Sequence, residues 1–272
     1  MNRLLQTDGR RVRPAACAGR FYPAESDILR RMVQDFLKSA RPSDGRSPKA
    51  IIAPHAGYIY SGPIAGTAYA ALRGDRDVIR RIVLLGPSHY VPLHGLATSS
   101  ADAFATPLGD VPLDRAAVQQ AESQPHVAAS DGAHAPEHCL EVQLPFLQLV
   151  LGDFTLVPLL VGDATPEEVA RVLATFWGGP ETRIVVSSDL SHYRSYPAAQ
   201  ALDAATARAI ELLRTEDVED DGACGCRPIR GLLHQAGKLG LKVKTLDLRN
   251  SGDTAGPRDQ VVGYGAFMFT EA

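Results

Sequence analysis

Residues 82–90, which read IVLLGPSHY, show the local design that decides the fold: a short apolar run, a turn, and a histidine followed by an aromatic residue. Residues 51–58 (IIAPHAGY) and 184–193 (IVVSSDLSHY) repeat this design. Each apolar run is rich in β-branched residues and too short for an independent helix, which predicts a buried strand. Three such strands indicate an open sheet whose functional groups gather at the carboxyl ends of the strands.

The segments around these stretches alternate between predicted helices and predicted strands. Helices are expected over 26–39, 63–72, 114–122 and 198–213, and from Pro136, Thr165 and Pro228 onward; further strands are expected over 154–161, 241–248 and 261–269. Such alternation predicts βαβ units, and no linker divides the hydrophobic segments. We therefore expect a single α/β domain over 1–272, with a central, largely parallel or mixed sheet flanked by helices and a flexible or peripheral arm over 1–14.

Composition excludes several classes of function. The formal net charge is −3, from 28 basic and 31 acidic residues, and the basic residues form no long block, so no nucleic-acid partner is expected. No run approaches the roughly 20 apolar residues of a membrane span, and the polar start is no secretory signal. The four cysteines form no evenly spaced framework. A reduced, cytoplasmic protein is the expectation.

Three histidines follow the predicted strands and are expected to face one crevice. His55 and His89 each come one turn after a strand, and His192 follows Asp189 by three residues. Neutral imidazole is the commonest protein ligand for metals, so their convergence beside a carboxylate predicts a metal or acid–base site. Each histidine alone is equally compatible with a ring bonded to a backbone carbonyl. Asp189 is likewise compatible with a turn in which it accepts backbone amides.

Two further segments carry candidate residues. Cys224 stands in a Cys-Gly-Cys turn before a predicted helix, where a thiolate is stabilised by a metal or a helix start, although a small buried residue is the commoner role for cysteine. If Cys224 binds a metal, Cys226 would be a second ligand or a redox partner. His138 and Glu141 are three residues apart and share one face near the start of a predicted helix. Acidic residues there also suit the helix dipole alone.

Six blocks, in order along nearly the whole chain, resemble the MEMO family, also called AmmeMemoRadiSam system protein B. They are AGRFYP (18–23), APHAGY (53–58), GPSH (86–89), EHCLEVQLPF (137–146), SSDLSHY (187–193) and CG (224–225). The resemblance implies an α/β domain similar to class III extradiol ring-cleaving dioxygenases. It also implies genomic or fused company with the system's protein A and radical SAM proteins.

The same resemblance implies that His55, His89 and Cys224 hold a metal ion, with Asp189 and His192 in the same pocket. The dioxygenases bind Fe(II) with two histidines and a carboxylate, whereas a thiolate here would change metal preference and redox potential. Ring cleavage is therefore not inherited.

The leading functional hypothesis is a mononuclear metal-dependent oxidoreductase that acts with dioxygen. Iron is the first choice of metal, copper the second and zinc the third. His192 would move a proton and Asp189 would orient it or bind substrate, while three more residues are expected in the substrate pocket, namely Tyr58, His138 and Glu141. The main alternative is a non-catalytic metal- or peptide-binding module in the radical SAM-associated system. A zinc hydrolase ranks last, because no motif supplies a general base for a zinc-bound water.

Overall fold

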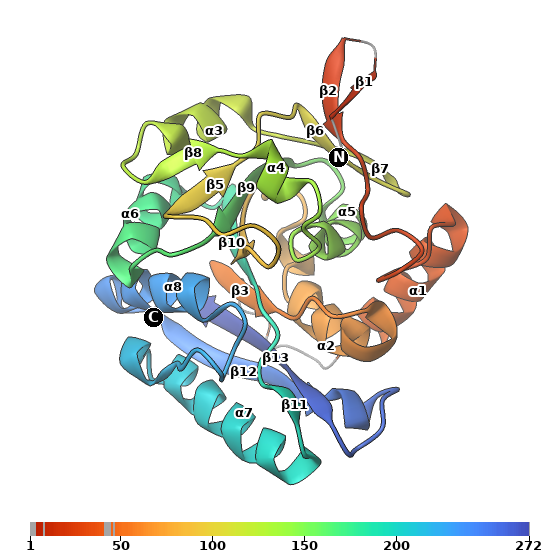
Figure 1. Cartoon of the computed structure of the whole chain (residues 1–272), viewed down its shortest axis with the longest axis vertical. Coiled ribbons are helices and arrows are strands. Elements are labelled where there is room, and N and C mark those ends of the chain that lie inside the picture. Colours follow the sequence, from red (N-terminus) through yellow and green to blue (C-terminus); the bar gives the residue numbers. More distant parts are fainter. Residues whose placement is uncertain (1–3, 8, 41–44, 46, 272) are drawn as a thin grey trace.

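A large mixed sheet organises the chain in the computed structural model, which describes residues 4–7, 9–40, 45 and 47–271. Nine strands of this part of the chain form the sheet in the order β11-β13-β3-β10-β4-β9-β5-β8, with β12 paired to β13 (Figure 1). Their bounds are β3 Ala50–Ala53, β4 Arg81–Pro87, β5 Leu96–Thr98, β8 Val127–Ala129, β9 Thr155–Val161, β10 Thr182–Ser187, β11 His192–Arg194, β12 Lys242–Asn250 and β13 Val261–Thr270.

Helices cover both faces of this sheet. One core packs α1, α2 and α5 against it, and a second core lies beneath α3, α6, α7 and α8. The helices are α1 Ser26–Lys38, α2 Tyr58–Ala70, α3 Arg115–Glu122, α4 Asp131–His134, α5 Leu144–Leu151, α6 Pro166–Phe176, α7 Tyr196–Glu211 and α8 Cys226–Leu239, with 3-10 turns at Arg73–Asp75, Glu141–Gln143, Thr215–Asp217 and Ser251–Asp253. The predicted α/β class, a mixed sheet flanked by helices, is confirmed.

A second, four-stranded sheet contains the start of the chain. β1 (Leu5–Thr7) and β2 (Arg10–Arg13) form a hairpin that joins β6 (Ala103–Thr106) and β7 (Gly109–Pro112). The hairpin projects at the top of Figure 1, yet Arg13 at its base is only 2% exposed. The expected arm over 1–14 is therefore anchored in the core at its end, while residues 1–3 and 8 lie outside the described residues.

Three adjacent strands place the predicted site. β10 pairs in parallel with both β3 and β4, so their carboxyl ends meet at one edge of the sheet. β4, in turn, runs parallel to β9. All the residues of β3 and β10 are buried, as expected for strands covered on both faces. His55, His89 and Asp189 follow these three strands within two residues.

Two predicted helix starts were wrong. α2 begins at Tyr58 rather than at residue 63, and Pro63 lies inside the helix, where its missing N–H removes one helical hydrogen bond. The helix expected from Pro136 begins only at Leu144, after a 3-10 turn. The Glu137 side chain accepts the amides of the next two residues, which holds this segment in a turn instead of a helix. The capping box at Thr165, by contrast, is confirmed.

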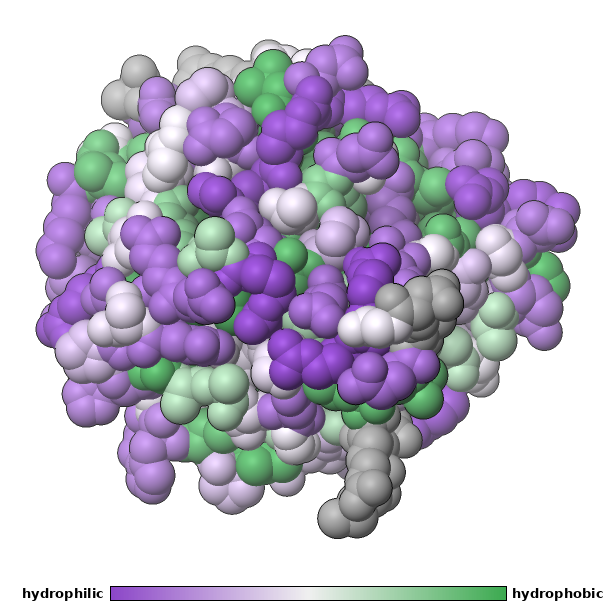
Figure 2. Space-filling view, turned by 90° about the horizontal axis from the view of Figure 1, so that it is seen from above, coloured by the Kyte–Doolittle hydropathy of each residue, from purple (hydrophilic) through white to green (hydrophobic). Residues whose placement is uncertain are grey.

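No helix among the described residues combines the length and apolar character that crossing a membrane requires. On the face drawn in Figure 2, apolar side chains lie in small separate groups between polar ones. This distribution is ordinary for a protein surface.

Candidate metal centre

A cavity of about 560 Å³ opens at the carboxyl ends of β3, β4 and β10. Its polar lining includes His55, His89, His138, Asp189 and His192. Aromatic side chains form much of the remaining wall, namely Phe21, Tyr60, Tyr193 and Tyr264. The structure therefore brings the three histidines that follow the predicted strands to one site, together with a fourth.

His55, His89 and His138 offer nitrogen atoms that all lie within 4.8 Å of one another. The centroid of the His55 ring is 5.2 Å from that of His89 and 5.3 Å from that of His138, and both neighbouring rings stand nearly perpendicular to it. Three imidazole nitrogens at this separation match the donor set that binds iron, copper or zinc. The cluster is thus able to hold a metal ion.

His55 is the most deeply buried member, with 2% of its surface exposed. Its backbone amide donates to Asp189 Oδ1 at 2.7 Å, and its Nδ1 lies 2.9 Å from Ser187 Oγ. Burial, followed by the charges of His138 and His89, holds the pKa of His55 well below its usual value. A neutral ring with Nε2 turned away from Ser187 is the form that binds a metal.

His89 is oriented by a buried carboxylate. Glu137 Oε1 accepts from His89 Nδ1 at 2.9 Å, and Glu137 Oε2 accepts from the His89 amide at 2.7 Å. Burial alone would raise the pKa of Glu137, but hydrogen bonds from His138 and His89 outweigh it and hold that pKa far below its usual value. The anionic carboxylate keeps the His89 proton on Nδ1, which leaves Nε2 for a ligand, an arrangement common beside metals.

Cys224 adjoins the histidine cluster through His55. Its Sγ lies 3.3 Å from His55 Nε2 and 3.6 Å from the Asp189 carbonyl oxygen. Gly225 makes this approach possible, because a Cβ there would lie 2.7 Å from the Ser188 side chain. Burial raises the pKa of the Cys224 thiol well above its usual value, so a bound cation is needed to make it a thiolate.

The assembled ligand group differs from the predicted trio of His55, His89 and Cys224. Among the described residues, the groups with mutually close donor atoms are His55 with His89 and His138, and His89 with Glu137 and Cys139. Cys224 lines a different cavity, of about 360 Å³. His138 is therefore added as a candidate ligand, and the role of Cys224 stays a prediction.

Asp189 and His192 border the cavity, as predicted. Asp189 Oδ1 accepts the amides of His55 and Ala56, and burial raises the pKa of its carboxyl group. His192 Nδ1 donates to the Leu190 carbonyl at 2.8 Å, which leaves Nε2 as the free ring nitrogen. Asp189 thus orients the backbone of a candidate ligand, and the proton-transfer role of His192 stays a prediction.

Two residues expected in the substrate pocket are not in its lining. Tyr58 is 2% exposed, and its hydroxyl donates to the Val142 carbonyl at 2.6 Å. Glu141 is fully buried and paired with Arg13 at 2.6 Å. Both predictions fail because these side chains turn into the core, and Tyr60 takes the place at the cavity that Tyr58 was expected to fill.

Several residues of the site carried little signal in the sequence. Ser187, at the end of β10, and Gln143, in a 3-10 turn, meet at 2.7 Å behind His55. In the sequence, Glu137 is only an acidic residue near a predicted helix start. The Glu137–His89 and Gln143–Ser187 contacts join residues 48 and 44 positions apart, so local periodicity cannot reveal them.

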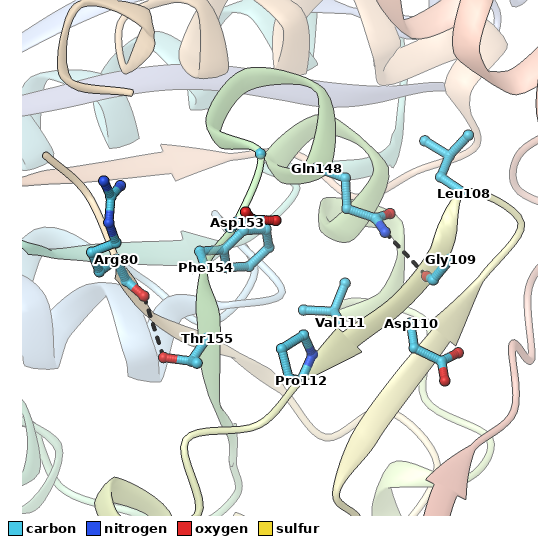
Figure 3. A pocket seen from close by; sticks show the side chains of 11 residues that line it. Arg80, Leu108, Gly109, Asp110, Val111, Pro112, Gln148, Asp153, Phe154 and Thr155 are labelled. Atoms are coloured by element: carbon cyan, nitrogen blue, oxygen red, sulfur yellow. Dashed lines mark hydrogen bonds between the residues drawn. The ribbon is translucent and has the colours of Figure 1, made fainter. Parts of the chain in front are cut away.

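Size alone does not locate this site. A larger cavity, of about 710 Å³, lies between β7 and the start of β9, where Gln148 Nε2 donates to the Gly109 carbonyl (Figure 3). Asp110, Asp153 and Arg80 also line it, and no histidine does. The convergence of donor atoms, rather than volume, distinguishes the histidine cavity.

The fold and this cluster together define an α/β protein with a site suited to a metal ion at the carboxyl edge of its sheet. A family model described as Memo-like protein matches residues 13–268, and the chain belongs to this family. It is 36% identical over 271 residues to a MEMO1 family protein of Aquifex aeolicus, covering 95% of this chain and 99% of the relative. It is also 37% identical over 285 residues to one of Aeropyrum pernix, covering 94% and 99%.

Among solved structures, an uncharacterized protein of Escherichia coli K12 aligns with a TM-score of 0.49 and 15% sequence identity. The alignment covers 80% of this chain and 99% of that chain.

Proposed function

We propose that the protein is a mononuclear metal-dependent oxidoreductase. The observation that supports this proposal is the meeting of His55, His89 and His138 within 4.8 Å at an aromatic cavity, with the Cys224 sulfur beside His55. Imidazole nitrogen and soft sulfur together favour iron first, copper next and zinc third. A bound iron or copper ion would supply one-electron chemistry with dioxygen.

The chain's own residues would prepare this site in three ways. Glu137 accepts the Nδ1 proton of His89 and so would present Nε2 of that ring to the ion. The aromatic wall formed by Tyr60 and Tyr264 would exclude water and contact the apolar part of an organic substrate. His192 would hold or release a proton from Nε2, because its Nδ1 is bonded to a carbonyl.

Metal stoichiometry tests the assignment. The protein is loaded anaerobically with Fe(II), and the bound metal is counted in the wild type, His55→Ala and His89→Ala. Both variants should lose most of the bound metal, whereas His94→Ala, whose side chain is 97% exposed, should retain it. Unchanged metal content in His55→Ala and His89→Ala would remove the proposal.

Oxygen uptake by the loaded protein, followed with a panel of phenols and thiols, tests the oxidoreductase role. His192→Ala should retain the metal and lose turnover. A fully loaded wild type that consumes no oxygen with any compound would contradict this part of the proposal.

A second candidate, non-catalytic metal carriage, is favoured by one observation. Asp189 supplies the carboxylate of the cavity lining. Its Oδ1 already accepts the amides of His55 and Ala56, so this oxygen is not free to act as a general base in catalysis. Rapid transfer of Cu(I) from the protein to a chelator, without oxygen uptake, would support carriage. The predicted association with system protein A and radical SAM proteins stays a prediction.

A further inference from the structure

Behind His55 lies a buried chain of hydrogen bonds that the proposed chemistry does not use. Tyr69 of α2 donates from its hydroxyl to Gln143 Oε1 at 2.8 Å, and Gln143 Nε2 donates to Ser187 Oγ at 2.7 Å. Ser187 Oγ in turn lies 2.9 Å from His55 Nδ1. Tyr69, Gln143 and Ser187 are all fully buried, so water does not substitute for any of these partners.

The direction of the bonds around Gln143 follows from its neighbours. Gln143 Nε2 lies 3.0 Å from the Pro54 carbonyl oxygen, which can only accept. The nitrogen of the amide must therefore face Pro54, and its second proton goes to Ser187. The amide oxygen is left for the Tyr69 hydroxyl, so every hydrogen-bonding group of this amide has a partner.

The direction at Ser187 follows in the same way. Its Oγ lies 2.7 Å from the Cys139 carbonyl oxygen, and two oxygens at that distance need a proton between them. The single hydroxyl proton of Ser187 therefore goes to Cys139. One lone pair accepts from Gln143, and the remaining lone pair can only accept the proton of His55 Nδ1.

We propose that Ser187, held by Gln143, is the positioning residue that fixes His55 as its Nδ1–H tautomer and so directs the Nε2 lone pair toward the metal site. This role of Ser187 deepens the proposed metal site. Only its effect on metal affinity rests on the proposed function. In the metal-free protein the tautomer is a property of the hydrogen bonds alone. His89 receives the same orientation from a charged carboxylate, whereas His55 receives it from a neutral hydroxyl.

The decisive variant is Ser187→Ala, which removes one buried oxygen and adds no volume. Without the hydroxyl, a proton on Nδ1 would be buried without an acceptor, so the Nε2–H tautomer should become the main form. Long-range ¹⁵N–¹H correlation spectra of the metal-free, ¹⁵N-histidine-labelled protein report which ring nitrogen carries the proton. The wild type should show Nδ1–H at His55, and Ser187→Ala should show Nε2–H.

Ser61→Ala is the matched control. Ser61 is 1% exposed, and its hydroxyl donates to the Ala56 carbonyl at 2.7 Å without a bond to any histidine ring. This variant should lose comparable stability and leave the His55 spectrum unchanged. Gln143→Leu should keep Nδ1–H as the main form at His55, because the Ser187 proton still goes to the Cys139 carbonyl.

Binding of Zn²⁺ alone, measured by competition with a chromophoric chelator, gives the consequence for the site. Ser187→Ala should bind Zn²⁺ about 10- to 100-fold more weakly than the wild type, and Ser61→Ala should bind it unchanged. An Nε2–H signal in the wild type, or an unchanged Nδ1–H signal in Ser187→Ala, would overturn the inference. If the wild type binds no metal but shows the expected tautomers, the proposed function fails and the inference on the tautomer stands.

Discussion

Glu137 and Glu141 are four residues apart in one segment, and each places a buried carboxylate among four hydrogen-bond donors. Glu137 accepts twice from His89 and from the amides of His138 and Cys139. It faces the histidine cluster and orients a candidate ligand.

Glu141 accepts from Arg13, Tyr22 and the amides of Ala16 and Cys17. None of these four donors lines the cavity, and their bonds fasten the start of the chain to the core. The comparison teaches that the same residue type, burial and number of bonds serve the site in one case and the fold in the other.

The largest effect is expected from substitution of Glu141, the carboxylate that serves the fold. Glu141→Gln leaves the Arg13 guanidinium buried without a charged partner, because Arg13 is itself only 2% exposed. The free energy of unfolding, measured by urea titration, should fall by about 3–5 kcal/mol. Arg13→Met combined with Glu141→Gln removes both charges and should recover part of the loss. A loss below about 1 kcal/mol in the single variant would show that the pair is not the anchor.

Acid should weaken the same structural region. Burial lowers the pKa of His134 from 6.5 to about 4, and the Arg13 guanidinium donates to the His134 carbonyl. The unfolded chain binds the His134 proton below pH 6.5, while the folded chain binds it only below about pH 4. Stability is therefore complete above pH 6.5 and is lost as the pH falls toward 4, by roughly 3 kcal/mol for this group.

Urea titrations at pH 7 and pH 4.5 measure this loss. His134→Gln should reduce the difference between the two pH values, though His55, whose pKa is also lowered by burial, retains a share of it. His94→Gln, at a 97% exposed side chain, should leave the difference as in the wild type. An undiminished difference in His134→Gln would contradict the assignment.

Substitution of Glu137, the carboxylate that faces the histidine cluster, should affect metal binding more than folding. Glu137→Gln keeps the shape of the side chain but replaces one accepting oxygen by an NH2 group. That NH2 group then faces either the backbone N–H or the ring N–H of His89, and both of these are donors. Affinity for Zn²⁺ should fall about 10- to 100-fold, with a smaller loss of stability than in Glu141→Gln. Chelator competition and urea titration on both variants make the comparison. Equal losses of affinity in the two variants would erase the distinction between them.

The smallest effect is expected at Tyr193, where the site departs from ordinary backbone geometry. Tyr193 has φ of 55° and lies at an irregularity between His192 and Arg194 in the pairing of β11 with β13. Its side chain lines the cavity. A residue with a Cβ is strained in this left-handed region by roughly 1–2 kcal/mol.

Tyr193→Gly should therefore be more stable than Tyr193→Ala by about 1 kcal/mol, since the two variants differ only by that Cβ. Thermal unfolding of the pair measures the difference. A more stable Ala variant would show that the strain is absent and that the site, like the Glu141 region, is relaxed.

Local patterns predicted much of the fold. The β-branched runs marked β3, β4 and β10, the apolar stripe marked α1 at Ser26–Lys38, and the capping box marked the start of α6. These signals are local because strand and helix periodicity is written in neighbouring residues. One of the two wrong helix starts has a partly non-local cause. The Glu137 carboxylate that accepts the amides of the next two residues is also bonded to His89, 48 positions away.

The sequence by itself determined that His55, His89, Asp189 and His192 meet, because parallel strands bring their carboxyl ends to one edge. Only the tertiary structure decided that His138 joins the cluster and that Tyr58 and Glu141 turn into the core. It alone placed Ser187 and Gln143 behind His55. Those outcomes depend on contacts between residues 44 to 128 positions apart, whose geometry follows from packing rather than from any local period.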